Sequence, residues 1–383
     1  MRKICVITER RAEYGILRPV LSEIDNHPDL ELCLIVTGAH LSKKFGYTIK
    51  DIEKDNFRID YRIPLKNYDD TGASMANFVG EFTIEMVNAL KDIKPSILFV
   101  GFDIGAHLAA AIAAAYMAIP IAHLHGGEIS GSVDESIRHA LTKLSHIHFA
   151  TTDKNAERLI KMGEEPWRVF IVGAPSLDTI IHKKLLDKEE IEKKYGVNFD
   201  SPVIIILQHP VVTEINESIK QFKETIEASQ EVYCQKIIIY PNADGGSQNI
   251  VREIEKIERT KDKNIKIFKS FPHKDFLSLL KHSSVLVGNS SSGIIEAPSF
   301  KLPVVNVGTR QERRQRAENV IDVGYNKQDI KEAIEKALYD EKFKNKVKSC
   351  GNPYGDGKAS VKIAEVLTNI DLDERLISKK MTY

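Results

Sequence analysis

The sequence lacks an excess of charge of either sign. It has 54 Lys and Arg residues and 54 Asp and Glu residues, so its formal net charge is zero. A protein that binds nucleic acid or an anionic membrane through its overall field carries a surplus of positive charge. We therefore expect neither partner, and an anionic small molecule would have to be bound by local hydrogen-bond donors.

Cysteine and long apolar runs are also scarce. Cys5, Cys33, Cys234 and Cys350 stand far apart and form no CxxC pair, which is typical of a reducing compartment. No apolar run approaches the roughly 20 residues that span a bilayer, and the apolar stretch near the start is too short for a signal peptide. We expect a cytoplasmic protein.

The order of apolar runs predicts an α/β protein. Short β-branched runs alternate with longer helical patterns, and the series restarts after a charged stretch at 185–202. Continuous apolar strands joined by helices indicate parallel sheets that are covered on both faces. The predicted strands cover 3–8, 31–38, 96–102, 119–127, 146–152 and 169–176, and then 203–210, 236–244, 265–272, 284–293 and 302–310.

A chain of 383 residues is too long for one ordinary core. We predict two doubly wound Rossmann-like domains that face one cleft, with a ligand beyond the carboxyl ends of the strands. The predicted boundaries are 1–180 for the N-terminal domain and 181–365 for the C-terminal domain. A tail, 366–383, is predicted to pack back on the N-terminal domain.

Polar residues follow two strands of the second domain. In GNSSSGIIEAPSF, Ser290 and Ser291 precede a helical pattern, where free N–H groups and hydroxyls bind an anion. Glu296 suits the two hydroxyls of a ribose, and Arg310 in GTRQ suits a phosphate. The alternatives are a serine-rich helix cap, a solvated first-turn Glu and a solvated basic face.

Three further kinds of side chain follow strands of this domain. Phe271 and Phe276 are candidates to flank a nucleobase, although a Phe pair is more often part of a core. His209, which precedes a proline, is a candidate ligand contact or proton carrier. Asn242 is a candidate polar group of the cleft or an ordinary turn residue.

Charged residues follow the strands of the first domain. Carboxylates that surround one pocket can differ in pKa and act as acid and base, or they can be solvated loop residues. The candidates are Arg10, Arg11, Asp103, Glu128, Asp134 and Glu135.

A metal site is the other interpretation of the segment 121–150. His123, His125, His139, His146 and His148 lie in it, and imidazole is a zinc ligand. No HExxH or other fixed ligand spacing is present, so we expect no metal.

The motifs in their order resemble the hydrolysing UDP-N-acetylglucosamine 2-epimerases of sialic-acid-type biosynthesis. The resemblance covers nearly the whole chain and is carried by RAEYG, TGAHLS, FGYT, HGGEISGSVDESIRHALTKLSH, VGAPSLD, HPV, YPNADGGS, VGNSSSG and GTRQ.

This resemblance implies a glycosyltransferase-B type fold, with UDP held by the second domain and the sugar facing the first. It implies loss of the C2 proton and of UDP, a glycal intermediate, and addition of water to give free N-acetylmannosamine. It implies no metal or other cofactor, a UDP-sugar as the substrate, and a homodimer or homotetramer.

The resemblance also implies roles for individual residues. Asp103, Glu128 and Asp134 match the carboxylates that move protons, and His209 matches a strand-end His near the departing phosphate. Arg11 matches an Arg of the first loop. Ser290, Ser291, Glu296 and Arg310 match the UDP site, with Phe271 and Phe276 near the uracil; Glu135, His40, Gly173 and Asn242 are less specific matches.

Two departures border the sugar side of the predicted site. The family has Gly-Asp-Arg where this chain has Gly101-Phe102-Asp103, and Gly-Thr or Gly-Asn where it has Glu9-Arg10. One hypothesis is that Arg10 replaces the lost guanidinium. An alternative substrate is a 2,4-diacetamido-2,4,6-trideoxy sugar on UDP or GDP, which belongs to the legionaminic acid route.

Three other functions compete with this prediction. A glycosyltransferase of the same fold would not need the carboxylates Glu128 and Asp134 so close together. A nucleotide-sugar sensor would not need Asp103 and His209. The non-hydrolysing 2-epimerases have a His-Val-Glu-Ala-Gly type segment, and HLHGGE favours the hydrolysing branch.

Overall fold

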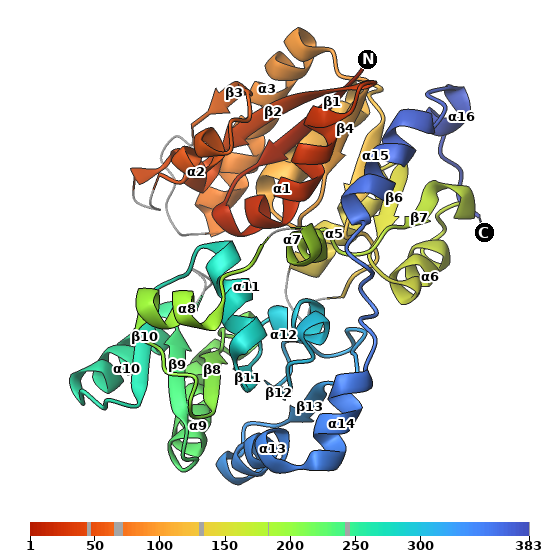
Figure 1. Ribbon diagram of the computed structural model, residues 1–383. Coiled ribbons are helices and arrows are strands. Elements are labelled where there is room, and N and C mark those ends of the chain that lie inside the picture. Colours follow the sequence, from red (N-terminus) through yellow and green to blue (C-terminus); the bar gives the residue numbers. More distant parts are fainter. Residues whose placement is uncertain (44–46, 65–71, 130–133, 183, 242–245, 383) are drawn as a thin grey trace. The chain divides into compact units, whose positions relative to one another are not determined.

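The computed structural model describes residues 1–382 apart from 44–46, 65–71, 130–133, 183 and 242–245. The chain divides into two compact units (Figure 1). The first comprises Met1–Glu128, Asp134–Asp178 and Tyr354–Tyr383, and the second comprises Thr179–Pro353 and the segment that begins at Ile129. The domain boundaries at 180/181 and 365/366 stay predictions.

The first unit is built on a parallel sheet. Its strands lie in the order β3-β2-β1-β4-β5-β6-β7. This order reverses between β1 and β4, as in a doubly wound fold. The strands are β1 (Arg2–Thr8), β2 (Leu30–Thr37), β3 (Ile59–Ile63), β4 (Ile97–Val100), β5 (Ile121–Leu124), β6 (Ile147–Ala150) and β7 (Val169–Ile171).

Both faces of this sheet are covered by helices. In β1, Ile4 and Val6 enter one apolar cluster while Cys5 and Ile7 enter another, because successive side chains of a strand point to opposite faces. The helices are α1 (Arg11–Asn26), α2 (Ile49–Lys54), α3 (Gly72–Ile93), α4 (Gly105–Tyr116), α5 (Asp134–Leu144), α6 (Asp153–Lys161) and α7 (Ser176–His182), with 3-10 turns η1 (Gly38–Leu41) and η3 (Pro166–Arg168).

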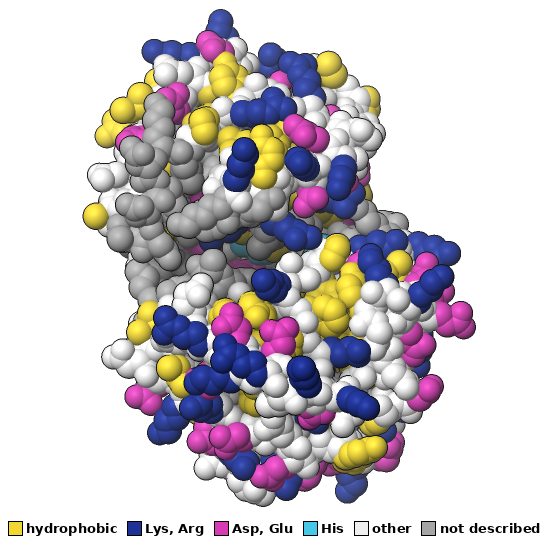
Figure 2. Space-filling model, turned by 90° about the vertical axis from the view of Figure 1, so that its left-hand side faces the viewer, with side chains coloured by type: hydrophobic (Ala, Val, Ile, Leu, Met, Phe, Trp, Pro, Cys, Tyr) yellow, Lys and Arg dark blue, Asp and Glu magenta, His cyan; other side chains and the backbone are white. Residues whose placement is uncertain are grey.

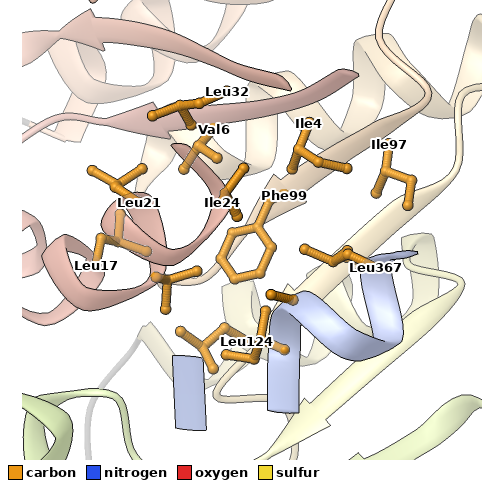
Figure 3. Close-up of a cluster of buried hydrophobic side chains, with 14 of the residues drawn as sticks. Ile4, Val6, Leu17, Leu21, Ile24, Leu32, Ile97, Phe99, Leu124 and Leu367 are labelled. Carbon is orange, nitrogen blue, oxygen red and sulfur yellow. The ribbon is translucent and has the colours of Figure 1, made fainter. Parts of the chain in front are cut away.

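The C-terminal segment completes the first core. Figure 3 shows Leu367 beside Phe99 and Ile97, and Leu367 belongs to α15 (Ala359–Asn369). Figure 1 shows this helix, drawn in blue, beside the first sheet, followed by α16 (Glu374–Ile377). The buried Asp178 carboxylate accepts hydrogen bonds from Ala359 N at 3.0 Å and Ser360 N at 2.6 Å, so it caps α15.

The second unit repeats the same topology. Its parallel strands lie in the order β10-β9-β8-β11-β12-β13, which reverses between β8 and β11. The predicted α/β fold with two doubly wound sheets is therefore confirmed. The strands are β8 (Val203–Leu207), β9 (Gln235–Ile239), β10 (Ile265–Phe268), β11 (Val285–Gly288), β12 (Val304–Val307) and β13 (Val320–Val323).

Two apolar clusters again flank this sheet. Ile204 and Ile206 pack in one, and Ile205 and Leu207 pack in the other. The helices are α8 (Lys188–Tyr195), α9 (Ser218–Gln230), α10 (Ser247–Arg259), α11 (His273–His282), α12 (Ser292–Ile295), α13 (Lys327–Tyr339) and α14 (Glu341–Ser349), with 3-10 turns η4 (Val212–Glu217) and η5 (Ala297–Phe300).

The surface matches the neutral composition. Figure 2 shows Lys and Arg side chains interspersed with Asp and Glu side chains on the visible face. In the part of the chain that the structure describes, no helix has the length and apolar character that a membrane span requires.

Candidate active site

The first sheet reverses its strand order between β1 and β4, and ligands of doubly wound sheets bind at the carboxyl ends there. The loop after β1 contains Glu9 and Arg10, and the loop after β4 contains Asp103. The next strand, β5, leads into His125 and Glu128. Three predicted residues, Arg10, Asp103 and Glu128, therefore follow neighbouring strands of one sheet.

Arg138 joins two of these strand ends. It lies on α5, is 6% exposed, and its guanidinium contacts the carboxylate of Asp103. Its Nη1 also donates to the carbonyl oxygen of Glu128 at 3.2 Å. A buried guanidinium needs such acceptors, so Arg138 fixes the loops after β4 and β5 relative to each other.

Arg138 also bears on the hypothesis about the lost guanidinium. The residue after Asp103 is Ile104 rather than an arginine, yet a guanidinium reaches Asp103 from α5. Arg10 Nη2 lies 3.4 Å from Glu9 Oε1, and its side chain is 43% exposed. The catalytic role of Arg10 stays a prediction.

Glu128 is held in a hydrogen-bonded cluster. It is 6% exposed, and its Oε1 lies 2.8 Å from His125 Nδ1 and 2.8 Å from Thr151 Oγ1. Asn155 Nδ2 donates to the Thr151 hydroxyl at 2.8 Å. Because the amide uses an acceptor position of the hydroxyl, the hydroxyl proton is directed to Glu128.

The backbone before Glu128 needs residues that tolerate a left-handed conformation. His125 has a φ of 62° and Gly127 a φ of 74°. A Cβ at Gly127 would overlap the Asn155 backbone oxygen, which explains the glycine physically. His125 tolerates this region better than a β-branched residue would, and the turn directs Glu128 back toward His125.

A buried carboxylate pair lies beneath the loop after β1. Burial raises the pKa of Glu9. Burial alone would also raise the pKa of Glu13, but His107 and the Glu9 backbone N–H outweigh it and lower that pKa. His107 Nε2 lies 3.4 Å from Glu13 Oε2, while its Nδ1 accepts from Gly101 N at 3.2 Å. Glu13 contacts the Glu9 backbone N–H, and His107 contacts both Glu13 and Gly101 N. Glu13 and His107 together therefore join the loop after β1 to the loop after β4.

The other predicted residues of the first unit are Arg11, His40, Glu135 and Asp134. Arg11 is exposed and lies 3.8 Å from Asp51. His40 is buried between the hydroxyls of Thr8 and Thr48, at 3.0 and 2.7 Å, and burial lowers its pKa to about 4. Glu135 Oε1 lies 3.4 Å from His139. Asp134 begins α5, and its side chain lies outside the described part.

Two of the histidines weighed as metal ligands are hydrogen-bonded to protein groups. His148 Nε2 lies 2.9 Å from Glu164 Oε2, and His146 Nδ1 accepts from Ile121 N at 3.1 Å. Burial lowers the pKa of both rings. Over the residues that the structure describes, no group of three or more His, Cys, Asp or Glu is arranged to hold a metal.

The second sheet has its own reversal, between β8 and β11. His209 follows β8 and Asn289 follows β11. Asn289 Oδ1 accepts from His209 N at 2.7 Å, and its Nδ2 donates to His209 O at 2.9 Å. Burial, together with the charge of Arg310, lowers the pKa of His209 well below its ordinary value, so the ring is neutral at neutral pH.

Arg310 and Gln311 contact the same strand end. Arg310 Nη1 lies 3.2 Å and Gln311 Nε2 lies 2.9 Å from the carbonyl oxygen of Asn289. Ser290 and Ser291 directly precede α12, and Ser290 Oγ accepts from Ser292 N at 3.3 Å. The structure thus brings the predicted His209, Arg310, Ser290 and Ser291 together around Asn289.

The loop that contains Arg310 is anchored by Glu214. This carboxylate accepts from Thr309 Oγ1 at 2.7 Å, from Gln221 Nε2 at 2.7 Å and from the Tyr325 hydroxyl at 3.0 Å. Burial opposes the shift, but the hydrogen bonds lower the pKa of Glu214. Gly308 has a φ of 78°, and a Cβ there would overlap the Tyr325 ring.

Five further candidates remain, and they differ in what surrounds them. The Phe271 ring packs against Tyr195 and Phe268, with centroids at 4.8 and 4.7 Å, so the core accounts for it. Its base-stacking role, and that of the half-buried Phe276, stay predictions. Glu296 is buried at the end of α12. Gly173 packs against the backbone of Tyr354, and Asn242 lies outside the described residues.

Several site residues were missed in the sequence. Arg138 lies within ESIRHALTK and Asn289 within VGNSSSG, but neither was singled out. His125 was considered only as a metal ligand. The signal for Arg138 was its spacing: it lies one helical turn after Asp134, on a helix that starts at the strand ends.

Comparisons with known proteins place this geometry in a family. A family model described as UDP-N-acetylglucosamine 2-epimerase matches residues 22–368. The UDP-N,N'-diacetylbacillosamine 2-epimerase (hydrolyzing) of Legionella pneumophila is 39% identical over 383 residues, 100% of both chains. The UDP-N-acetylglucosamine 2-epimerase of Neisseria meningitidis serogroup B is 38% identical over 372 residues, 96% of each chain.

The fold agrees with a solved structure. The crystal structure of UDP-GlcNAc 2-epimerase from Neisseria meningitidis bound to UDP-GlcNAc aligns with a TM-score of 0.80 at 22% identity, covering 95% of this chain and 99% of that one. The family model and the two relatives each cover most of the chain. The chain belongs to the UDP-N-acetylglucosamine 2-epimerase family.

Proposed function

We propose that this protein is a hydrolysing UDP-N-acetylglucosamine 2-epimerase, which converts UDP-N-acetylglucosamine and water to N-acetylmannosamine and UDP for nonulosonic acid biosynthesis. The observation that carries the proposal is the cluster at the strand ends of the first unit. There Arg138 contacts both Asp103 and the backbone of Glu128, and the Glu128 carboxylate is hydrogen-bonded to His125. The cluster supplies groups that can accept and return protons.

The reaction needs such groups. When a base removes the C2 proton, the electron pair of the C–H bond forms a C1=C2 double bond. The C1–O bond breaks at the same time, and its electron pair leaves with UDP. Water then adds across the double bond: its oxygen bonds to C1 and it gives one proton to a base, while the π electron pair takes a proton from an acid at C2, on the face opposite to the one that lost its proton. We propose that Asp103, Glu128 and Asp134 serve these proton transfers.

The second unit supplies groups for the departing nucleotide. Arg310 is a cation placed at the end of β11 through Asn289, and a guanidinium stabilises phosphate oxygens bidentately. The neutral His209 ring lies at the neighbouring strand end. Negative charge that develops on the β-phosphate as the C1–O bond breaks is stabilised by such preorganised donors. We propose that Ser290, Ser291, Glu296 and Arg310 bind UDP.

A second candidate substrate is the UDP-linked 2,4-diacetamido-2,4,6-trideoxy sugar. The Legionella pneumophila relative, 39% identical over the whole chain, carries the name of a diacetylbacillosamine 2-epimerase. The Neisseria meningitidis relative named for UDP-N-acetylglucosamine is 38% identical. The two identities are nearly equal, so turnover decides between the sugars.

The test is incubation of the purified protein with UDP-N-acetylglucosamine in D2O, with EDTA present, followed by proton NMR. Free N-acetylmannosamine with deuterium at C2, together with UDP, is the expected result. The UDP- and GDP-linked diacetamido-trideoxy sugars form parallel reactions, and faster turnover of one of them would identify the second substrate. A product still linked to the nucleotide would contradict hydrolysis, and ligand binding without turnover would favour a sensor.

The assembly is a separate proposal. We propose a homodimer or homotetramer, on the family resemblance. Sedimentation velocity at several protein concentrations measures it, and a monomer at all of them would contradict it.

A further inference from the structure

His125 has one ring nitrogen bonded to a carboxylate and one buried without a protein partner. Its Nδ1 lies 2.8 Å from Glu128 Oε1. Its Nε2 is buried and has no hydrogen-bond partner among the residues that the structure describes. The side chain is 10% exposed. Leaving a buried polar atom without a partner is destabilising, so a native structure that keeps one calls for an explanation such as a catalytic role.

The neighbours of Glu128 determine which nitrogen of His125 carries the proton. Asn155 Nδ2 donates to the Thr151 hydroxyl, which in turn donates to Glu128 Oε1 at 2.8 Å. The ionised Glu128 carboxylate can only accept, so in that state the hydrogen bond between the two residues comes from His125 Nδ1–H. Nε2 is then the unprotonated nitrogen, with a lone pair that can accept a proton.

The arrangement matches an oriented base. A carboxylate that holds one imidazole nitrogen fixes the tautomer and stabilises the imidazolium that forms when the other nitrogen takes a proton. The φ of His125, 62°, shows that its backbone is held in a sparsely populated conformation. The Phe102 ring, with its centroid 5.5 Å away, covers part of the imidazole.

We propose that His125 Nε2, rather than the Glu128 carboxylate, accepts the C2 proton in the elimination step, and that Glu128 is a positioning residue. The inference rests on the proposed function and deepens it. The C2–H electron pair forms the C1=C2 bond, the C1–O pair leaves with UDP, and the proton forms an imidazolium paired with Glu128. The imidazolium returns that proton to water before the next turnover.

The kinetic test compares three variants in the D2O assay, on whichever nucleotide sugar the wild type turns over. His125→Asn keeps a donor toward Glu128 but has no basic nitrogen, so kcat should fall by about 10²–10⁴ with KM within about threefold. Glu128→Gln keeps an oxygen that accepts both hydrogen bonds, so kcat should fall much less, by about tenfold. The double variant should be no slower than His125→Asn, since residues that act as a unit are not additive.

The opposite pattern would overturn the proposal. If Glu128 is itself the base, Glu128→Gln loses about 10²–10⁴ in kcat while His125→Asn loses little. His27→Asn, a change of a surface histidine at the end of α1, is the matched control and should leave kcat unchanged. Added imidazole should restore part of the activity of His125→Ala, which a purely structural histidine would not show.

A measurement without substrate separates this proposal from the proposed function. Nitrogen-15 NMR of the histidine rings, with His125 assigned by its loss in His125→Asn, should show the Nδ1–H tautomer. The Nε2–H tautomer would overturn the proposal whatever the enzyme turns over. If no nucleotide sugar is a substrate, the proposed function fails, and the tautomer alone then decides whether Nε2 is an acceptor.

Discussion

Removing the Asp178 carboxylate should detach the C-terminal segment from the first unit. Asp178 is buried and accepts from Ala359 N at 3.0 Å, Ser360 N at 2.6 Å and Ser360 Oγ at 2.6 Å. Ala359 and Ser360 are themselves 1% and 6% exposed. Asp178→Ala therefore leaves two buried N–H groups and a hydroxyl without acceptors.

The size of the effect follows from these bonds. Each unsatisfied buried group costs about 1–3 kcal/mol, and the lost N-cap is worth about 1 kcal/mol, with strong overlap between them. We expect Asp178→Ala to lower the free energy of unfolding of the first unit by about 3–5 kcal/mol. Asp178→Asn keeps one acceptor oxygen and should cost about 1–2 kcal/mol.

The single tryptophan gives a local signal for this loss. The Trp167 ring contacts the guanidinium groups of Arg168 and Arg375, whose Cζ atoms are 4.2 and 4.4 Å from its centroid. Arg375 belongs to α16 in the C-terminal segment, so tryptophan fluorescence reports whether the segment is docked. With a slope of about 2–3 kcal/mol per molar urea, the midpoint should fall by about 1–2.5 M.

The control is the corresponding helix cap in the second unit. Asp340 caps α14 by accepting from Lys342 N at 2.8 Å and Phe343 N at 3.1 Å. Asp340→Ala should leave the tryptophan midpoint unchanged, because Trp167 belongs to the first unit. If Asp178→Ala shifts the midpoint no more than Asp340→Ala, the account of the C-terminal segment is wrong.

Two further predictions concern an ion pair and a glycine. Burial would raise the pKa of Glu164, but His148 and Lys379 lower it to about 2. The ionised Glu164 carboxylate therefore stabilises the folded protein fully above pH about 4.5, and this contribution is lost as the pH falls toward 2. Glu164→Gln should flatten acid unfolding in that window, and an unchanged profile would contradict the assignment. Gly308→Ala forces a Cβ into the Tyr325 ring, so UDP affinity measured by calorimetry should fall by tenfold or more, and wild-type affinity would refute the role of this loop.

The central strands could be predicted from the sequence because they are continuous apolar runs. β1 and β8 are buried over most of their length, and burial on both faces removes the polar alternation that marks an edge. Two of the outermost strands, β3 and β13, were missed. Their sequences, IDYRI and VIDV, are short and partly polar, and most of their residues are only half-buried, so they resemble loops until a neighbouring strand pairs with them.

The predicted strands also ran too far, and this error has a physical cause. The segment 119–127 was predicted as one strand, whereas β5 ends at Leu124. His125 and Gly127 have positive φ values that break the extended conformation. The residues that end the strand are the ones that turn Glu128 back toward His125.

The sequence by itself determined the α/β class, the family and the strand-end positions of Asp103, Glu128, His209 and Arg310, because local apolar patterns and motif order depend on neighbouring residues. Only the tertiary structure decided the partners. Arg138 reaches Asp103 across 35 positions, and Asn289 joins His209 across 80. Such pairings depend on which strands lie side by side, and that order is fixed by packing of the whole sheet.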